Sequence, residues 1–268
     1  MSLPLTLSAA ACQVLCTASS ADKVALSAQF ANAWRDGAII EIGDTTPPHR
    51  PARPERPQLL HPSDMPRRRK GGAAGRLAFL HAIAHIELNA IDLAWDIVCR
   101  FPDEAMPREF FDDWVNVAAD EARHFDLLAK RMDDLGGAYG ELPAHDGLWE
   151  AAEQTTDDLM ARLALVPMVL EARGLDITPG AIEKLRANGD IKSADILKTI
   201  SDEEVPHVAA GVRWLTFLAK QRGIERVAAF HEIVRSRFKG QIKPPFNHAA
   251  RDKAGMDRAF YETTTPAP

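Results

Sequence analysis

The chain has 268 residues and a formal net charge of −6, with 26% charged and 46% hydrophobic residues. This composition is typical of a globular protein with a substantial buried core, in one large domain or two small ones, and it disfavours binding of nucleic acid through bulk positive charge. Three cysteines are too few for a disulfide framework, which indicates a reducing compartment and predicts a cytoplasmic protein.

The N-terminal segment is apolar from Leu3 to Thr17 and is followed by small residues, as a signal peptide would be. No lysine or arginine precedes it, so the sequence favours an amphipathic helix over a signal peptide. Helices are expected over residues 5–18 and 22–37, the second after small polar residues that can cap it. No other stretch is apolar for long enough to span a membrane, and no membrane association is expected.

A proline-rich arm extends from Gly43 to Lys70 and contains seven prolines, which break helices and favour extended structure. A disordered linker is one interpretation of this composition. The scattered apolar residues Leu59, Leu60 and Met65 favour an ordered arm that wraps the surface of the domain. The dense basic run from Arg67 to Lys70 is interpreted as a solvated linker or helix entrance.

Apolar residues recur with helical spacing through most of the remaining chain, which predicts an all-α fold. Four long helices are expected over residues 75–101, 107–135, 148–175 and 191–221. Thr178-Pro179-Gly180 is expected to interrupt the third, with a short helix over 181–187 after it. A last helix is expected over 225–238. The expected divisions are 1–71 for the N-terminal helices and arm, 72–238 for a four-helix bundle, and 239–268 for a polar tail.

The pattern Glu-x-x-His occurs twice, in the second and in the fourth of the long helices. A three-residue step on an α-helix places the carboxylate and the imidazole side by side on one face. Each motif also has a lone glutamate upstream, in the preceding helix and at nearly the same separation. One such motif is common by chance, but all of these residues interrupt apolar helical stripes. The candidate metal ligands and catalytic residues are Glu87, Glu121, His124, Glu171, Glu204 and His207.

Helix geometry predicts that the glutamates of each helix pair face each other. Glu87 and Glu121 are equally far from the turn between their helices, so an antiparallel hairpin brings both to the same depth, about 21 Å from that turn. The distances of Glu171 and Glu204 from the turn between their helices match less closely, because the short helix over 181–187 lies between Glu171 and that turn.

Two prolines lie close to the expected ligands in the second pair of helices. Pro167 precedes Glu171 by one helical turn, and Pro206 is adjacent to His207. Each should remove an intrahelical hydrogen bond, because proline has no backbone N–H. We interpret them as distortions that aim the ligands, with ordinary kinks as the alternative.

The chemistry of these six residues indicates two divalent metal ions. Four buried carboxylates without a counter-charge would be very costly, and two such ions supply the four positive charges required. Carboxylate and imidazole ligands suit iron, with manganese or a mixed pair as alternatives, and no thiolate belongs to the motif. Salt bridges among polar residues are the other explanation, but they need arginines on these stripes, and Arg123 and Arg173 are expected to point elsewhere.

Four segments carry a resemblance to known proteins: His81 to Ala94, Asp120 to Phe125, Leu170 to Gly180 and Asp202 to His207. Through them the chain resembles the ferritin-like superfamily and, within it, a family of uncharacterised bacterial ferritin-like proteins that is a domain of unknown function. It is also distantly similar to the tRNA-hydroxylating non-haem di-iron monooxygenases, which share the ligand order. This resemblance implies a ferritin-like four-helix core with a dimetal centre, because two glutamates and two Glu-x-x-His motifs are the ligand set of such di-iron and di-manganese carboxylate proteins.

Other polar residues near the motifs have expected supporting roles. His81 and His85 are four residues apart, and a structural role or a role in supporting the metal ligands is favoured for them over metal binding or proton relay. The only tyrosines, Tyr139 and Tyr261, are not on a core stripe, which disfavours a radical-generating subunit. The candidates to orient the ligating histidines are Asp92, Asp120 and Asp202.

Three functions fit this site. The first is an oxidoreductase of the hydroxylase or oxygenase type, which uses O₂ or peroxide on an unknown small-molecule or RNA substrate, with an electron-donor protein as a further partner. RNA would bind through Arg67 to Lys70 and Lys239 to Lys243, but the acidic balance disfavours it. The second is an iron-binding, ferroxidase or peroxide-scavenging protein, for which a homo-oligomer is an option. The third is a non-catalytic interaction module stabilised by its metals.

Overall fold

The computed structural model describes residues 3–66, 72–101 and 105–262. Within these ranges the regular elements are helices, and the only β-type pairings are two isolated bridges, so the predicted all-α class is confirmed. The chain divides into two compact units, Met1–Glu150 and Ala151–Pro268. Each unit is built around its own helical hairpin.

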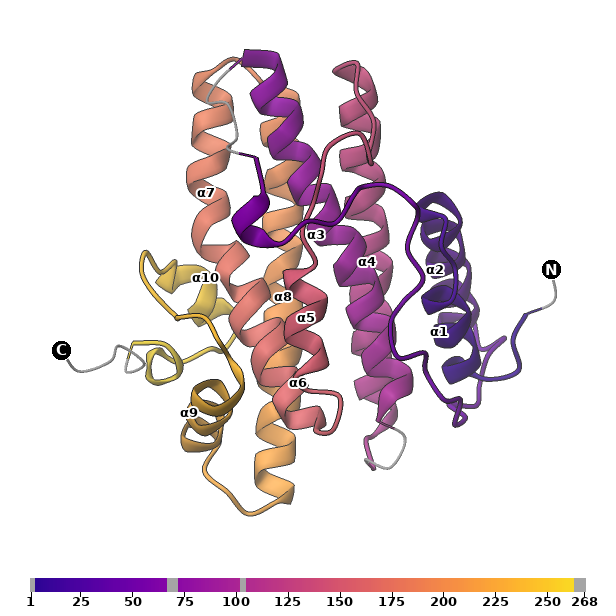
Figure 1. Ribbon diagram of the computed structural model, residues 1–268. Coiled ribbons are helices and arrows are strands. Elements are labelled where there is room, and N and C mark those ends of the chain that lie inside the picture. Colours follow the sequence, from indigo (N-terminus) through magenta and orange to yellow (C-terminus); the bar gives the residue numbers. More distant parts are fainter. Residues whose placement is uncertain (1–2, 67–71, 102–104, 263–268) are drawn as a thin grey trace. The chain divides into compact units, whose positions relative to one another are not determined.

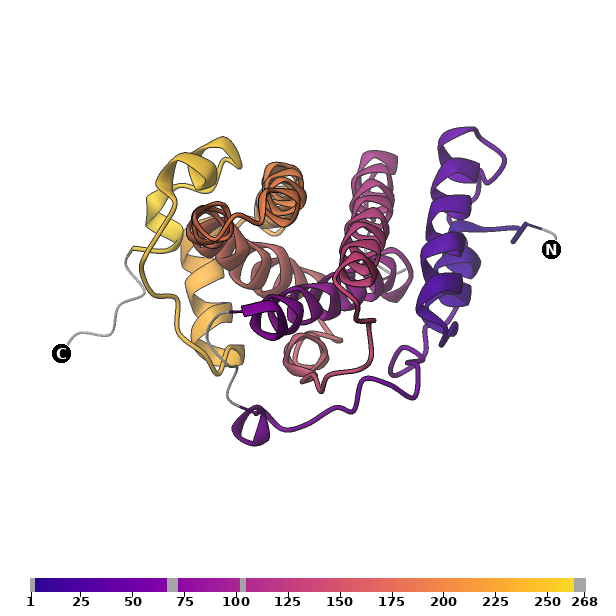
Figure 2. The ribbon, with the colours of Figure 1, turned by 90° about the horizontal axis from the view of Figure 1, so that it is seen from above.

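The first unit is organised around two long antiparallel helices. Helices α3 and α4 lie side by side, and α1 packs against α3 while α2 packs against α4 (Figures 1 and 2). The side chain of Ser19 accepts a hydrogen bond from the Asp22 N–H at the start of α2, as its capping position predicts. These helices are α1 (Leu7–Leu15), α2 (Ser20–Arg35), α3 (Gly72–Arg100) and α4 (Arg108–Asp134).

The proline-rich arm is ordered where the structure describes it, and the dense basic run at its end lies outside the described residues. Its described part contains the 3₁₀-helix η1 (Pro62–Asp64). Backbone hydrogen bonds attach it at several points: the Ala52 N–H donates to the Leu15 carbonyl at 2.7 Å, and the Leu60 N–H donates to the Ala144 carbonyl at 2.8 Å. The arm therefore follows the surface of the first unit (Figure 1).

A buried ion cluster holds the arm to α2 and α3. Arg53 of the arm pairs with Asp92 of α3 at 2.6 Å and donates to Asn89 at 2.6 Å, while the fully buried Lys23 of α2 pairs with the same aspartate. Asp92 thus pairs with two cations. Its expected role in orienting a ligating histidine is wrong, because its carboxylate is already committed to Lys23 and Arg53.

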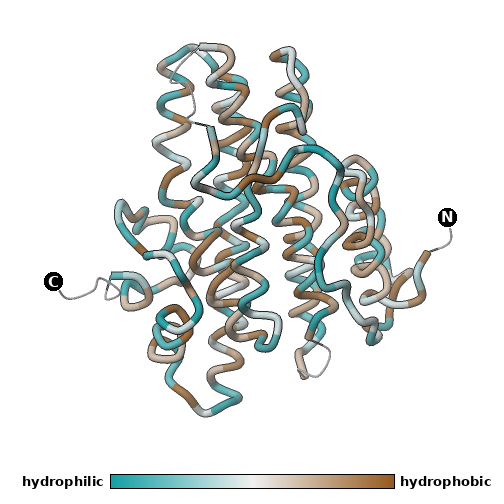
Figure 3. The backbone as a smooth tube through the Cα atoms, viewed as in Figure 1, coloured by the Kyte–Doolittle hydropathy of each residue, from teal (hydrophilic) through white to brown (hydrophobic). Residues whose placement is uncertain are grey.

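Helix α3 is long and apolar enough to be considered as a membrane span, with a mean hydropathy of 1.3. However, 67% of that window is buried inside the structure, which is more typical of the core helix of a soluble protein than of a membrane span. Apolar and polar residues are interspersed along the helices in Figure 3, as expected for amphipathic elements.

The second unit is organised around α7 and α8, a second antiparallel pair (Figure 1). Between α6 and α7 the helix widens into a π-helix, η2, which contains Pro167 and ends at Glu171. Helix α5 (Gly147–Glu153) precedes this unit's hairpin in the chain. The elements of the second unit are α6 (Leu159–Leu165), η2 (Val166–Glu171), α7 (Ala172–Ala187), α8 (Ile191–Gln221), α9 (Arg226–Arg237), α10 (His248–Lys253) and the 3₁₀-helix η3 (Arg258–Phe260).

Two expectations for this part of the chain are wrong, and α10 and η3 are not predicted. The single helix expected over residues 148–175 is broken between α5, which ends at Glu153, and α6, which begins at Leu159. Helix α7 is not interrupted at Thr178-Pro179-Gly180: the Leu175 carbonyl, which Pro179 cannot serve, accepts a hydrogen bond from the Asn247 side chain at 3.1 Å. The segment after residue 238 contains α10 as well as polar chain. Arg251 of α10 is buried and donates to both carboxylate oxygens of Asp176, at 2.9 and 2.7 Å.

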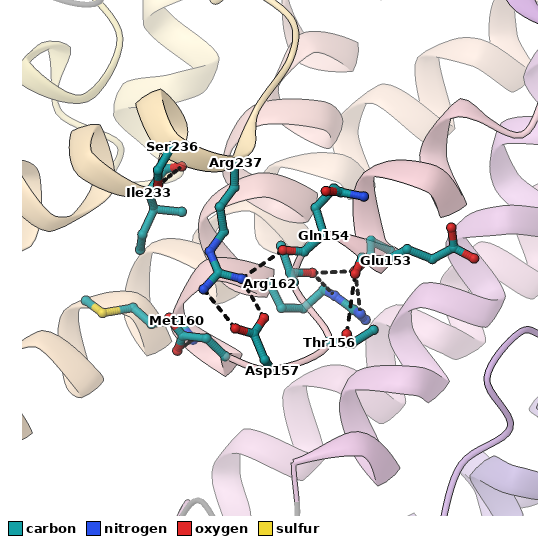
Figure 4. Close-up of polar contacts among 12 residues, drawn as sticks. Glu153, Gln154, Thr156, Asp157, Met160, Arg162, Ile233, Ser236 and Arg237 are labelled. Atoms are coloured by element: carbon teal, nitrogen blue, oxygen red, sulfur yellow. Dashed lines mark hydrogen bonds and ion pairs between the residues drawn. The ribbon is translucent and has the colours of Figure 1, made fainter.

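Helix α9 is attached to the turn that precedes α6. Arg237 donates to Asp157 at 2.5 Å and to the Gln154 carbonyl at 2.8 Å (Figure 4). Beside the same turn the buried Arg162 donates to the Thr155 hydroxyl at 2.7 Å, which satisfies a cation that would otherwise be costly in the core.

The π-helix depends on close contact with a glycine of α8. A β-carbon added to Gly211 would lie 2.5 Å from Cγ of Pro167 and 3.3 Å from Cγ of Met168. Any larger residue would therefore push the two segments apart. Pro167 thus marks a helix distortion next to Glu171, as predicted, whereas α8 continues through Pro206.

Candidate metal sites

The first candidate site lies on the hairpin of α3 and α4. One ligand atom from each of Glu87, Glu121 and His124 lies within 4.8 Å of the others. His124 Nδ1 is 3.2 Å from Oε2 of Glu87 and 3.5 Å from Oε2 of Glu121. All three side chains are buried in the core. The structure therefore brings together the three residues as the hairpin geometry predicts, while their role as metal ligands stays a prediction.

Burial gives these residues unusual proton affinities. Removal from water, together with repulsion from Glu121, raises the pKa of Glu87 well above its ordinary value. Burial alone would lower the pKa of His124, but hydrogen bonds to Glu121 and Glu87 outweigh it and raise the pKa to about 11. Protons held by these residues thus offset the negative charge of the buried carboxylates, as a bound cation would do in their place.

The basic side chains beside this site are engaged in other ion pairs. Arg123, between the two ligands of α4, pairs with Asp120 at 3.0 Å near the surface, as its expected outward direction requires. Lys23 and Arg53 pair with Asp92. Each of these cations thus has an acidic partner outside the ligand set.

The second candidate site belongs to the second unit. Glu171 is the last residue of η2, which packs against α8, and α8 carries Glu204 and His207. His207 Nδ1 is 3.6 Å from Oε2 of Glu204, and the imidazole is buried. The second Glu-x-x-His motif thus has the same side-by-side geometry as the first.

Neighbouring residues of the second site are only partly as expected. Arg173 points away, donating to the Lys243 and Pro245 carbonyls at 2.9 and 3.0 Å. Asp202, a candidate to orient His207, is exposed and pairs with Lys198.

Tyr139 is a residue near the first site that helical spacing does not reveal, because it lies in the loop after α4. Its ring stacks on His81 and His85, with centroids 5.2 and 6.2 Å away, and meets the edge of Phe125 at 5.0 Å. Tyr261 of the second unit is buried and lies in a similar cluster of aromatic and histidine rings. Both tyrosines therefore contribute to packing although neither lies on a helical stripe.

His81 and His85 are hydrogen-bonded to neighbouring parts of the first unit, while their role stays a prediction. His85 Nε2 donates to the His145 carbonyl at 3.2 Å, so its Nδ1 accepts from the Tyr139 hydroxyl at 2.8 Å. The Gly140 N–H donates to His81 Nε2 at 3.0 Å. Burial, assisted by Arg53, lowers the pKa of His85 to about 4.

Comparison with known proteins identifies the family. The family described as "Protein of unknown function (DUF455)" matches residues 16–262. An uncharacterized protein of Haemophilus influenzae is 42% identical over 212 residues, which cover 76% of this chain and 72% of that protein. No solved structure matches the chain. The chain therefore belongs to the DUF455 family, whose function is unknown.

Proposed function

We propose that the protein binds two divalent metal ions and uses them as an O₂- or peroxide-dependent oxidoreductase. The observation that carries this proposal is the buried group on α3 and α4, in which ligand atoms of Glu87, Glu121 and His124 lie within 4.8 Å of one another. Iron is the first candidate, with manganese or a mixed pair as alternatives. The proposed ligands are Glu87, Glu121, His124, Glu171, Glu204 and His207.

The donor set fits such ions. Each unit offers two carboxylates and one imidazole, and within each motif the histidine lies beside its glutamate, at 3.5 Å for His124 and 3.6 Å for His207. Hard divalent cations with some affinity for nitrogen favour this mixture, whereas the buried thiol of Cys99 is not part of either set. The α3–α4 and α7–α8 hairpins supply the four helices that a ferritin-like core requires.

The chain's own residues have defined tasks in this proposal. When bound, iron would supply the electrons that reduce O₂ or peroxide. Glu87 and Glu121 would hold a cation, which would relieve the repulsion between their carboxylates, and His124 would have to release a proton before its nitrogen could act as a ligand. The apolar residues around the ligands exclude water.

Metal analysis tests the binding step. Protein purified without chelators is expected to contain two metal ions per chain, measured by inductively coupled plasma mass spectrometry. The Glu121→Gln variant is expected to lose at least one ion, because it removes a charged ligand with little change in volume. Glu109→Gln is the matched control, since Glu109 lies exposed on the same helix. Equal metal content in all three proteins would refute the assignment of Glu121.

Oxygen uptake tests the catalytic step. The Fe(II)-loaded protein is expected to consume O₂ and to develop charge-transfer absorption, and Glu121→Gln is expected to do neither. Metal binding without O₂ or peroxide consumption would instead support a structural metal in an interaction module. Repeated uptake with excess Fe(II), accompanied by a large symmetric oligomer in light scattering, would support an iron-handling protein.

A further inference from the structure

A pocket of about 200 Å³ opens in the first unit, away from the metal ligands. It lies between α3 from Ala74 to Ile86, the end of the arm at Met65 and Pro66, and the loop from Leu142 to Leu148. All of its described lining side chains are apolar except three histidines, His81, His85 and His145. The pocket therefore offers an apolar interior with a small polar edge.

The pocket and the metal ligand of α3 point in different directions. His85 lines the pocket, and Glu87 is two residues further along the helix, which corresponds to a rotation of about 200°. A molecule in the pocket would thus lie on the opposite side of α3 from Glu87. A role for this pocket is therefore independent of the proposed metal chemistry.

The rings of His81 and His85 are held in place by contacts with neighbouring residues. Tyr139 stacks on His81 and His85, its hydroxyl bonds to His85, and the next residue, Gly140, bonds to His81. His85 also bonds to the His145 carbonyl. These contacts fix the imidazole planes before a ligand enters, so little side-chain entropy is lost on binding.

The lining is uncharged, which limits the ligands that fit. The described lining residues include no aspartate, glutamate, lysine or arginine. His85 donates through one ring nitrogen and accepts through the other, which is the bonding pattern of a neutral imidazole. A charged ligand would lose its hydration in this pocket without gaining a counter-ion.

His145 offers a hydrogen-bond donor among the lining residues of the pocket. Its Nδ1 accepts from the Gly147 N–H at 3.3 Å, which places the proton of the neutral ring on Nε2. This residue is only partly buried and lines the pocket. An acceptor atom on a ligand is therefore the natural partner of the His145 Nε2–H.

We propose that this pocket binds an uncharged aromatic molecule that carries one hydrogen-bond-accepting oxygen. An apolar cavity of about 150 Å³ accommodates benzene, so the volume here suits one ring with a small substituent. The ring packs against the alanine face of α3 and the histidine rings, and its oxygen accepts from His145. Phenol is the simplest probe with these properties.

Binding is measured by calorimetry and by NMR of histidine labelled at Cε1, using the full chain as purified. Phenol is expected to bind with a dissociation constant of about 1 mM and to shift the resonances of His81 and His145. Toluene, which lacks the acceptor, is expected to bind about fivefold more weakly. Benzoate, which matches the shape but is charged, is expected to bind at least about tenfold more weakly than phenol.

Filling the pocket locates the site. Ala78→Leu places a larger side chain on the lining and is expected to weaken phenol binding at least about tenfold. Ala73→Leu makes the same change at an exposed position of α3 outside the pocket and is expected to leave binding unchanged. Circular dichroism checks that both variants are folded.

Several results would overturn the proposal: no saturable phenol binding to the unmodified chain, benzoate binding as tightly as phenol, or equal binding by a folded Ala78→Leu variant. The comparison of phenol with benzoate needs no variant, so the proposal remains refutable even if Ala78→Leu fails to fold. Loss of metal does not mimic these outcomes, because the pocket residues are not metal ligands.

Discussion

The buried histidine His85 makes the stability of the protein depend on pH in a defined window. Its pKa is about 4 in the folded protein, chiefly because of burial, against 6.5 as the ordinary value. Between these values the unfolded chain binds a proton that the folded chain excludes. The contribution of this neutral imidazole to the free energy of unfolding is complete above pH 6.5 and is lost as the pH falls towards 4. The difference corresponds to about 3 kcal/mol of unfolding free energy.

The substitution His85→Gln isolates this contribution. Glutamine can accept from the Tyr139 hydroxyl and donate to the His145 carbonyl, but it does not titrate. Urea unfolding followed by circular dichroism from about pH 7 to pH 4 should show that the wild type loses about 3 kcal/mol relative to this variant. His49→Gln, at an exposed position, should keep a constant difference from the wild type over the same range.

The comparison of the wild type with the two variants cancels the contributions of the other titrating groups to the pH dependence of stability. Glu87 and His124 also have shifted pKa values, but they titrate in the wild type and in both variants, so their contributions cancel in the differences. If the difference between wild type and His85→Gln were the same at both ends of the pH range, the burial of a neutral imidazole at this position would be refuted.

Three further predictions concern the arm, the π-helix and the metals. Asp92→Asn should cost about 3–5 kcal/mol in urea unfolding because it leaves the buried Lys23 without its counter-ion, and a loss below about 1 kcal/mol would contradict this. Gly211→Ala should destabilise the second unit by about 1–3 kcal/mol, because its methyl group would overlap Pro167; an unchanged unfolding midpoint would show that the contact is loose. Adding Fe(II) or Mn(II) anaerobically at about 100 times its dissociation constant should stabilise the protein by about 2.7 kcal/mol, reversibly with EDTA, whereas an unchanged melting temperature would contradict metal binding to the folded state.

Local rules predict three of the four long helices well, those that correspond to α3, α4 and α8, because their ends are set by nearby residues. Helix α8 has the expected bounds, Ile191–Gln221, and Asp190 caps it by accepting from the Ser193 N–H. The interruption expected at Pro179 fails for a physical reason: the hydrogen bond that satisfies the freed carbonyl comes from Asn247, far along the chain. Such a partner belongs to tertiary structure and leaves no local signal.

The candidate sites likewise contain contacts that local sequence rules predict and contacts that they do not. The pairing of Glu121 with His124 follows from helical spacing alone, and the approach of Glu87 follows from counting residues to a turn. The stacking of Tyr139 on His85 does not follow, because a loop residue has no periodicity to place its side chain. Loop residues of this kind require the three-dimensional structure.

The π-helix acts as a phase shift within one long helical segment. Each α-helical residue turns the side-chain direction by about 100°, whereas a π turn contains about one residue more than an α turn. One π turn therefore shifts the directions of the following side chains relative to an uninterrupted α-helix. The direction of Glu171 is therefore set by the length of η2 as well as by its residues. A related chain that kept every ligand type but lost one residue between α6 and α7 would aim this glutamate elsewhere. Gap placement in this segment thus carries information about the direction of Glu171 that residue identity alone does not.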